Sequence, residues 1–341
     1  MITGAGGLIG SESALSFLSD GHKVVGVDNN ARMELFGPMG DIRPMITKLS
    51  EKSNYYHENL DITNQEAMEN LIKDEKPDAI IHCAAQPSHD KAASIPHRDF
   101  SINANGTLNL LEGCRKHAPE CIFIHLSTNK VYGDRPNNIP MYENETRYDY
   151  ADSSYLGISE KFPVDQCTHS LFGASKLAGD VLAQEYGRYF NMPVGVFRGG
   201  CLTGPQHAGV ELHGFLSYII KCAVEKKPYK IFGYKGKQVR DQIHCNDVVS
   251  AFKEFIINPR AGEVYNIGGC KENSASILEV IDMIYEISGN QLKYSYTDKN
   301  RVGDHICYYS DMSKFKKHYP NWSMQWNLED IVSDILANEI A

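Results

Sequence analysis

The sequence lacks the patterns that mark several classes of protein. None of its nine cysteines forms a C-x-x-C pair, which disfavours zinc ribbons and thioredoxin-type redox sites. No H-E-x-x-H motif or tight His/Asp cluster occurs, so we expect no bound metal. No run reaches the about 18 apolar residues that a membrane helix needs, so we expect no membrane partner.

Positive charge is also in short supply. Lysine and arginine total 34 against 43 aspartate and glutamate, a formal net charge of −9. A general nucleic-acid-binding protein needs a basic face, so we expect no nucleic-acid partner. The cysteines are odd in number and several lie in apolar runs, a pattern typical of buried thiols in a reducing compartment. We therefore expect a cytoplasmic protein.

Short apolar runs alternate with longer amphipathic stretches over the first two hundred residues. The predicted strands are His22–Val27, Ala79–Ala84, Cys121–Leu126 and Pro193–Phe197. The predicted helices are Ser11–Ser19, Gln65–Lys73, Ile102–His117 and Ser175–Phe190. Apolar strands separated by helices indicate a parallel sheet covered on both faces. The sequence therefore predicts an α/β protein with a Rossmann-type, doubly wound parallel sheet.

The composition of the chain changes after Arg198, where glycine and proline become more frequent and the predicted elements become shorter. We expect residues 1–197 to form the dinucleotide-binding domain and residues 198–341 to form a smaller substrate-binding lobe. Residues 238–257 are predicted to pack back onto the first domain. The tail Leu328–Ile340 has apolar residues at helical spacing and is predicted to cap the second lobe. We expect Trp322 and Trp326 to pack in the same lobe.

A glycine-rich turn opens the chain. Gly4 permits the tight turn, Gly7 lets the backbone approach a pyrophosphate, and Gly10 permits close packing of helix and strand. With Leu8 and Ile9 they form the predicted phosphate-binding part of a dinucleotide site. The strand before this turn would hold only Met1–Thr3, so we expect a few natural residues to precede it.

An acidic residue follows the next predicted strand. Asp28 lies 28 − 10 = 18 residues after Gly10, where a carboxylate binds the adenosine ribose hydroxyls. Its charge would repel a 2′-phosphate, so NAD is favoured over NADP, although nearby Arg32 is an opposing signal. We expect Asn29 and Asn30 to contact the same part of the cofactor.

Two later strand ends are expected at the same edge of the sheet, because ligands of open α/β sheets bind beyond the carboxyl ends of the strands. The first brings Asp61 and Ile62 to the adenine. The second brings the small residues Ala84 and Ala85, followed by Gln86, against the cofactor.

Several segments together resemble the extended short-chain dehydrogenase/reductases that modify nucleotide sugars. The segments are Gly4–Gly10, His82–Ala85, Asn103 with Gly106–Thr107, Ser127–Asp134, Gly173–Lys176 and Gln238–Asp241. Within this family, Ser127–Asp134 followed by Glu143–Tyr148 is most similar to the CDP-paratose 2-epimerase (CDP-tyvelose epimerase) group.

The resemblance implies an enzyme that transfers a hydride transiently between a nucleotide sugar and NAD. Thr128 would orient the substrate hydroxyl, Lys176 would bind the nicotinamide ribose, and Asn103 would lie at the cofactor. The partner would be a nucleotide-diphosphate sugar, with a CDP-sugar favoured. Relatives pair through two helices each, which implies a homodimer or homotetramer formed by Ile102–His117 and Ser175–Phe190. Tyr132 is expected to be structural.

The family's catalytic tyrosine is absent, because the Tyr-x-x-x-Lys motif begins with Phe172. Loss of a positioned general base commonly costs about 10²–10⁴ in rate. Three accounts remain open. The protein is an epimerase with another base, an enzyme of the same fold that catalyses a different reaction, or a nucleotide-sugar-binding protein with little turnover. The candidate replacement bases are His169, Cys201, His213, Tyr155 and Lys176 itself, should burial lower its pKa.

The resemblance also implies a substrate site. Ser127, Thr128 and Asn129 would contact the sugar. Sugar 4,6-dehydratases of the family carry an Asp-Glu pair at the positions of Asn129 and Lys130, so their elimination of water is disfavoured here. The alternative to 2-epimerisation is another NAD-dependent reaction of a nucleotide sugar, such as 4-epimerisation or dehydration. A second set of contacts comes from later in the chain: Cys201 at the sugar, Arg240 and Arg301 at the pyrophosphate, and Asp304 at the nucleoside ribose or Arg301.

Overall fold

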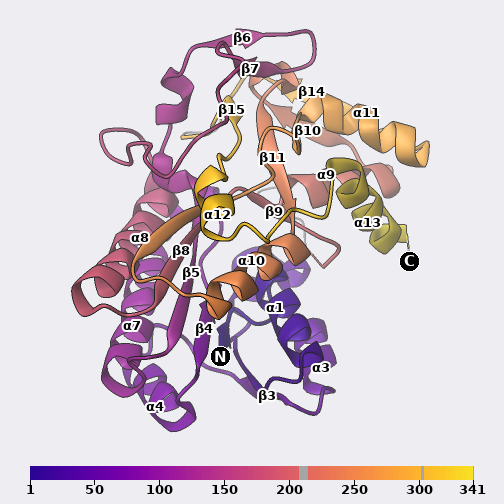
Figure 1. The fold of residues 1–341 in the computed structure, drawn as a ribbon. Coiled ribbons are helices and arrows are strands. Elements are labelled where there is room, and N and C mark those ends of the chain that lie inside the picture. The colour runs from indigo at the N-terminus through magenta and orange to yellow at the C-terminus, as the bar shows by residue number, and fades with distance from the viewer. Residues whose placement is uncertain (207–213, 301–302, 341) are drawn as a thin grey trace. The chain divides into compact units, whose positions relative to one another are not determined.

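The structure is a computed structural model that describes residues 1–206, 214–300 and 303–340 (Figure 1). The chain divides into two compact units, each built from three segments. Unit 1 contains Met1–Thr128, Leu171–Arg198 and Val248–Tyr265. Unit 2 contains Asn129–Ser170, Gly199–Asp247 and Asn266–Ala341.

Unit 1 is built on a seven-stranded sheet with the order β12-β8-β5-β4-β1-β2-β3. The strands are β1 (Ile2–Thr3), β2 (Val24–Val27), β3 (Tyr55–Glu58), β4 (Ala79–His82), β5 (Ile122–Thr128), β8 (Val194–Gly199) and β12 (Glu263–Ile267). Strand β1 pairs in parallel with both β2 and β4, so the chain reverses its winding direction there. This confirms the predicted doubly wound, Rossmann-type fold.

Helices cover both faces of this sheet. Figure 1 shows α4 (Gln65–Glu75), α7 (Gly106–His117) and α8 (Ser170–Phe190) on one side of the strands, and α1 (Leu8–Ser19) and α3 (Arg43–Ser50) on the other. The shorter elements are α2 (Ala31–Phe36), η1 (Gly37–Gly40), α5 (His89–Ala92), α6 (Pro96–Phe100) and the π-helical turn η2 (Ser101–Asn105). Most of helix α10 (Cys245–Ile257) also belongs to this unit, from Val248 onward.

Two strands of the sheet lie outside the predicted set. Tyr55–Glu58 forms β3 at one edge of the sheet, and Glu263–Ile267 forms β12 at the other edge. An edge strand has only one neighbour, so its sequence need not be a continuous apolar run. Tyr56 is exposed and His57 and Glu58 are only half-buried, which explains why β3 gave no apolar signal.

The core of unit 1 lies between the sheet and the helices α4, α7 and α8. Its buried residues include Ile80, Phe123 and Val196 from the strands and Met68 and Leu110 from the helices. Burial of apolar side chains on this scale is the main favourable term in folding, and it fixes the strand ends that carry the polar residues of the site.

The described residues of unit 2 form three smaller sheets. The largest joins β13 (Ser274–Ser276), β11 (Val239–His244), β15 (Cys307–Tyr308) and β9 (Cys201–Thr203). The other two pair β10 (Tyr229–Phe232) with β14 (Tyr294–Thr297), and β6 (Met141–Glu143) with β7 (Tyr148–Tyr150). Its short helices are η3 (Asn129–Tyr132), η4 (Arg135–Asn138), η5 (Tyr234–Gly236) and α12 (Ser313–His318).

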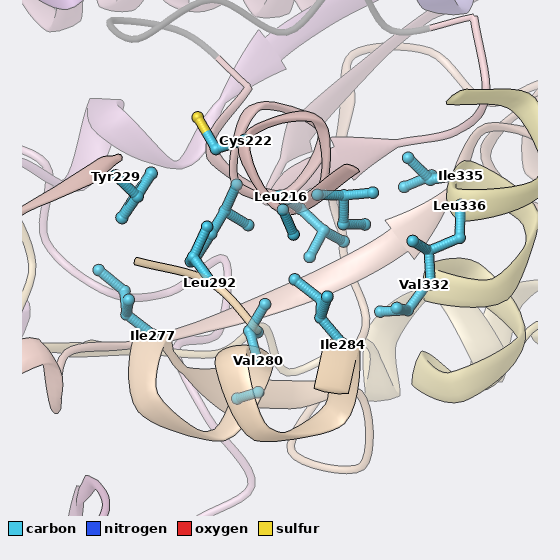
Figure 2. Close-up of a cluster of buried hydrophobic side chains, with 14 of the residues drawn as sticks. Leu216, Cys222, Tyr229, Ile277, Val280, Ile284, Leu292, Val332, Ile335 and Leu336 are labelled. Carbon is cyan, nitrogen blue, oxygen red and sulfur yellow. The ribbon is translucent and has the colours of Figure 1, made fainter. Parts of the chain in front are cut away.

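The core of unit 2 lies among α9 (Phe215–Val224), α11 (Ile277–Ser288) and α13 (Leu328–Ile340). Figure 2 shows Leu216 of α9, Ile284 of α11 and Val332 of α13 directed into this cluster. The prediction that the tail forms an amphipathic helix packed on the second lobe is confirmed. Trp322 packs against Phe315, and Trp326 stacks on His244 with ring centroids 4.0 Å apart, as predicted for this pair.

In the three described ranges, no helix is both long and apolar enough to cross a membrane. The same ranges contain no group of three or more His, Cys, Asp or Glu side chains arranged to hold a metal ion.

Candidate active site

The glycine-rich turn joins β1 to α1. Gly4 has a positive φ of +68°, and a Cβ added there would lie 2.7 Å from the backbone nitrogen of Ala84. A Cβ on Gly10 would lie 2.0 Å from the carbonyl oxygen of Gly4. Both glycines are therefore required by the turn itself, because the obstructing atoms are backbone.

Gly7 differs from its two neighbours in the turn. A Cβ added there would meet only the Gly4 oxygen, at 3.4 Å, which is ordinary contact. Gly7 is also the N-cap of α1, and no side chain caps that end of the helix. The open backbone of Gly7 and the uncapped amides of α1 fit the pyrophosphate of a dinucleotide, since helix N-termini attract anions.

Asp28 follows β2 and faces the glycine turn. Its carboxylate accepts hydrogen bonds from the backbone N–H groups of Gly6, at 3.1 Å, and Asn30, at 3.0 Å. Burial raises the pKa of Asp28, and these two hydrogen bonds act against that rise. The charge of Asp28 also acts on Arg32, whose pKa burial lowers. This set of groups fits the ribose hydroxyls of an adenosine.

The two asparagines after Asp28 hold neighbouring loops. Asn29 donates to Asp61 at 3.1 Å, which joins the end of β2 to the segment after β3. Asn30 has a positive φ of 56° and donates to Asp41 at 3.0 Å. Asp61 is exposed and presents its carboxylate, whereas Ile62 is buried in the hydrophobic cluster of unit 1.

A buried polar cluster supports the segment after β4. The backbone N–H of Gln86 donates to Asn103 at 2.9 Å, and the Gln86 side chain donates to Asp99 at 2.7 Å. Asn103 donates to Ser175, whose hydroxyl donates to Asp99. Burial raises the pKa of Asp99. The side chains of Gln86 and Asn103 therefore hold the backbone around Ala84 and Ala85 in place.

Lys176 lies on α8 with its side chain buried. Its Nζ donates to the carbonyl oxygen of Leu126 at 2.7 Å, near the carboxyl end of β5. Burial lowers the pKa of Lys176 to about 8, although the negative charge of Asp180 acts in the opposite direction. Phe172 is buried one helical turn earlier on α8. A buried amine with such a pKa exchanges a proton near neutral pH.

The last residues of β5 and the first residues of unit 2 carry several of the predicted sugar contacts. The Ser127 hydroxyl donates to Asp180 at 2.6 Å, and Thr128 follows at the end of β5. Asn129 is buried. Tyr132 is fully buried and donates to Asn266 at 2.7 Å.

Unit 2 carries a cluster of charged side chains at Asp304. Arg240 donates to Asp304 Oδ1 at 2.7 Å, and Lys130 donates to the same oxygen at 3.0 Å. Burial alone would raise the pKa of Asp304, but the positive charges of Arg240 and Lys130 lower it well below its usual value. Arg301, the other predicted phosphate ligand, lies outside the described residues.

The candidate replacement bases differ in their surroundings. Burial raises the pKa of the Cys201 thiol to about 12, which keeps it protonated. Nε2 of His169 lies 2.6 Å from the carbonyl oxygen of Val164 and so donates its proton there. Burial raises the pKa of Tyr155. His213 lies outside the described residues. Burial lowers the pKa of the remaining described candidate, Lys176, toward neutrality.

Three residues outside the predicted site form hydrogen bonds or ion pairs beside it: Lys130, Asp180 and Arg198. Asp180 lies four residues after Lys176, a spacing that places both on one face of α8. That spacing was the available signal, whereas the ion pair of Asp180 with Arg198 depends on tertiary structure.

Comparison with known proteins agrees with this arrangement. Residues 1–268 match the NAD dependent epimerase/dehydratase family. The chain is 32% identical over 337 residues to the CDP-paratose 2-epimerase of Salmonella typhi, covering 97% of this chain and 96% of that protein. It is 28% identical over 305 residues to the dTDP-glucose 4,6-dehydratase of Shigella flexneri, covering 86% and 79%.

Solved structures give the same relationship. A Tyr-to-Phe mutant of the UDP-glucuronic acid 4-epimerase from Bacillus cereus, in complex with UDP-4-deoxy-4-fluoro-glucuronic acid and NAD, matches with a TM-score of 0.81. That comparison covers 99% of this chain and 98% of the other at 27% identity. The family match and the overall similarity establish that this chain belongs to the NAD dependent epimerase/dehydratase family of nucleotide-sugar enzymes.

Proposed function

We propose that this protein is a nucleotide-sugar epimerase that acts by transient hydride transfer, with a CDP-sugar as substrate and an activity like that of CDP-paratose 2-epimerases. The similarity to the Salmonella typhi enzyme and the motif Ser127–Asp134 support the choice of substrate. The observation that carries the proposal is the buried Lys176, whose amine has a pKa of about 8 and lies at the end of β5.

The residues of unit 1 that would hold NAD fit that cofactor. Gly4, Gly7 and Gly10, with the intervening Leu8 and Ile9, would hold the pyrophosphate. Asp28 and Asn29 would bind the adenosine ribose. Asn30, Asp61, Ile62, Ala84, Ala85, Gln86 and Asn103 would complete the binding surface. NAD supplies a reversible hydride acceptor when bound; the chain itself must position the sugar and handle its hydroxyl proton.

Lys176 takes the role of base in this proposal, because Phe172 has no group that exchanges a proton. At a pH near 8 about half of the Lys176 side chains are neutral amines. Such an amine accepts the proton of the sugar hydroxyl as the same carbon gives up its hydride, which leaves a keto sugar. It returns the proton when the hydride comes back to the other face of the ring. Thr128 orients the reacting oxygen.

The substrate would be held by unit 2. Arg240 and Arg301 would bind the diphosphate, and Asp304 would bind the nucleoside ribose or position Arg301. Thr128, Asn129 and Cys201 are the proposed sugar contacts. Asn129 and Lys130 provide no carboxylic acid to protonate a leaving hydroxyl, which is why we favour epimerisation over dehydration.

Product analysis tests this function. The NAD-loaded protein is incubated with CDP-paratose, and separately with UDP-glucose, in D₂O, and the products are identified by NMR. Epimerisation at C2 by hydride return gives CDP-tyvelose with protium retained at C2. Elimination instead introduces solvent deuterium beside the oxidised carbon, and conversion of UDP-glucose to UDP-galactose indicates 4-epimerisation.

A nucleotide-sugar-binding protein with little turnover is the second candidate, and Phe172 is the observation that favours it. This candidate predicts binding of the nucleotide sugar by calorimetry without product. The variant Phe172→Tyr separates the two accounts. A large gain in kcat indicates an active site that has lost its original base, as the binding-protein account expects. A loss of kcat indicates a mechanism that depends on Phe172 and uses another base.

We also propose that the protein is a homodimer, or a homotetramer built from such dimers, formed through α7 and α8, and that it acts in the cytoplasm. Helix α8 exposes the apolar side chains of Leu171, Val181, Tyr189 and Phe190. Exposed apolar side chains gathered on one helix are typical of protein interfaces. Light scattering on the wild type and on Val181→Glu tests the proposed assembly.

A further inference from the structure

Helix α8 holds two consecutive residues near the carboxyl end of β5. Lys176 Nζ donates to the carbonyl oxygen of Leu126 at 2.7 Å, and the hydroxyl of Ser127 donates to Asp180 Oδ2 at 2.6 Å. Lys176 and Asp180 are four residues apart, which is about one helical turn. The next residue of β5 is Thr128.

Asp180 is itself fixed from two elements. Arg198 of β8 donates to both carboxylate oxygens, from Nε at 3.0 Å and from Nη2 at 2.9 Å. Gln184, a turn later on α8, donates to Oδ1 at 2.6 Å. Asp180 is fully buried and Arg198 is only 4% exposed. The hydrogen-bonded carboxylate therefore has little freedom to rotate away from Ser127.

A buried ion pair of this kind is a weak source of net stability, because the cost of desolvating both charges offsets much of their attraction. Its clearest effect is geometric. The bidentate contact with Arg198 fixes the plane of the carboxylate, and Oδ2 then sets the position of the Ser127 hydroxyl.

We propose that Asp180 is a positioning residue. Acting through Ser127, it fixes the position of Thr128 relative to Lys176. The inference rests on the proposed function in one respect, that Thr128 and Lys176 act on the substrate. Ser127 then serves as the link between Asp180 and β5, a role that replaces its expected contact with the sugar.

The variant Asp180→Asn would leave the Arg198 charge buried without its partner, and such a protein can fail to fold. Two milder variants form a matched pair. Ser127→Ala and Gln184→Met each remove one 2.6 Å hydrogen bond to Asp180. Only Ser127→Ala disconnects Asp180 from β5, and both variants keep the contact between Asp180 and Arg198.

The first readout is kinetic. We expect Ser127→Ala to lower kcat about tenfold with KM within about twofold of wild type, because small misplacements of a catalytic group are costly. Gln184→Met should leave kcat within about twofold. An equal loss of kcat in both variants, or no loss in Ser127→Ala, overturns the proposal.

The second readout requires no turnover. The protein is labelled with ¹³C at the threonine methyl groups, and the Thr128 resonance is followed by NMR in the NAD-loaded chain. Ser127→Ala should shift and broaden this resonance, and Gln184→Met should leave it unchanged. An unchanged Thr128 resonance in both variants overturns the proposal. If the wild type converts no nucleotide sugar, the proposed function fails, and this readout still decides whether Asp180 positions Thr128.

Discussion

Arg240 and Asp304 form an ion pair in unit 2, with Nη2 of the guanidinium 2.7 Å from Oδ1 of the carboxylate. Lys130 donates to the same oxygen at 3.0 Å. Among the described side chains, the one negative charge of Asp304 is therefore shared by the two positive charges of Arg240 and Lys130, and these three groups together carry +1. A diphosphate that approaches Arg240 meets this excess positive charge, although the protein as a whole carries −9.

The cluster predicts a role for Lys130 in ligand binding. We expect Lys130→Gln to weaken the binding of CDP about tenfold, because the cluster loses its excess positive charge. The affinity for NAD should not change. Calorimetric titration with each ligand measures both effects. Lys235→Gln, which removes an exposed lysine paired with Glu143, is the control. Equal losses of CDP affinity in the two variants would contradict a specific role for Lys130.

The glycine turn predicts opposite outcomes for two similar substitutions. Gly10→Ala places a Cβ 2.0 Å from a backbone oxygen, so we expect it to destabilise or unfold the protein. Gly7→Ala meets no such obstacle, so the fold should persist. Its methyl group would occupy space proposed for the pyrophosphate, so the affinity for NAD should fall at least tenfold. Thermal unfolding and NAD titration separate the two effects; unchanged NAD binding in Gly7→Ala would place the cofactor elsewhere.

Asp28 is predicted to select NAD over NADP. Asp28→Ala removes the proposed ribose contact and the charge that would repel a 2′-phosphate. We expect NAD binding to weaken about tenfold while NADP binding weakens less or improves, because the positive charge of Arg32 would attract the 2′-phosphate. Fluorescence titration with both cofactors measures the ratio of dissociation constants. A ratio equal to that of the wild type would show that Asp28 does not read the 2′ position.

Lys176 predicts the pH dependence of the reaction. Its amine must be neutral to accept a proton, and burial lowers its pKa to about 8. We therefore expect kcat/KM to fall about tenfold per pH unit below pH 8 and to level off above it. Lys176→Met should lower the rate by a factor of about 10²–10⁴, and the remaining rate should not fall below pH 8 in this way. A rate that is flat from pH 6 to about pH 9 would assign the proton transfer to another group.

The same residue predicts a cost in stability. The pKa of Lys176 is about 8 when folded and 10.5 otherwise, so the unfolded chain binds more protons between these values. Below pH 8 the folded protein therefore bears a penalty of about 3 kcal/mol, which shrinks as pH rises and vanishes above the unfolded value. Lys176→Met should raise the free energy of unfolding at pH 7, and the advantage should diminish toward pH 10.5. Urea titrations at several pH values measure this difference.

The sequence predicted the parts of the protein that depend on local pattern. The glycine turn, the central strands and the helix Leu328–Ile340 follow from backbone requirements and apolar periodicity, and the structure contains them. The edge strand β3 was missed because three of its four residues are exposed or half-buried, and β12 was missed although four of its five residues are buried. Contacts between distant residues were also missed. Ser127 and Asp180 are 53 residues apart, and only the packing of α8 on β5 brings them together.

One labelling experiment tests the central claim most directly. CDP-paratose carrying deuterium at C2 is incubated in ordinary water with the NAD-loaded protein at pH 8.5, and the product is examined by mass spectrometry and NMR. The account predicts CDP-tyvelose that keeps its deuterium at C2, because the hydride leaves and returns without exchange with solvent. Product that has lost the label, or no product while CDP-paratose binds, would contradict it.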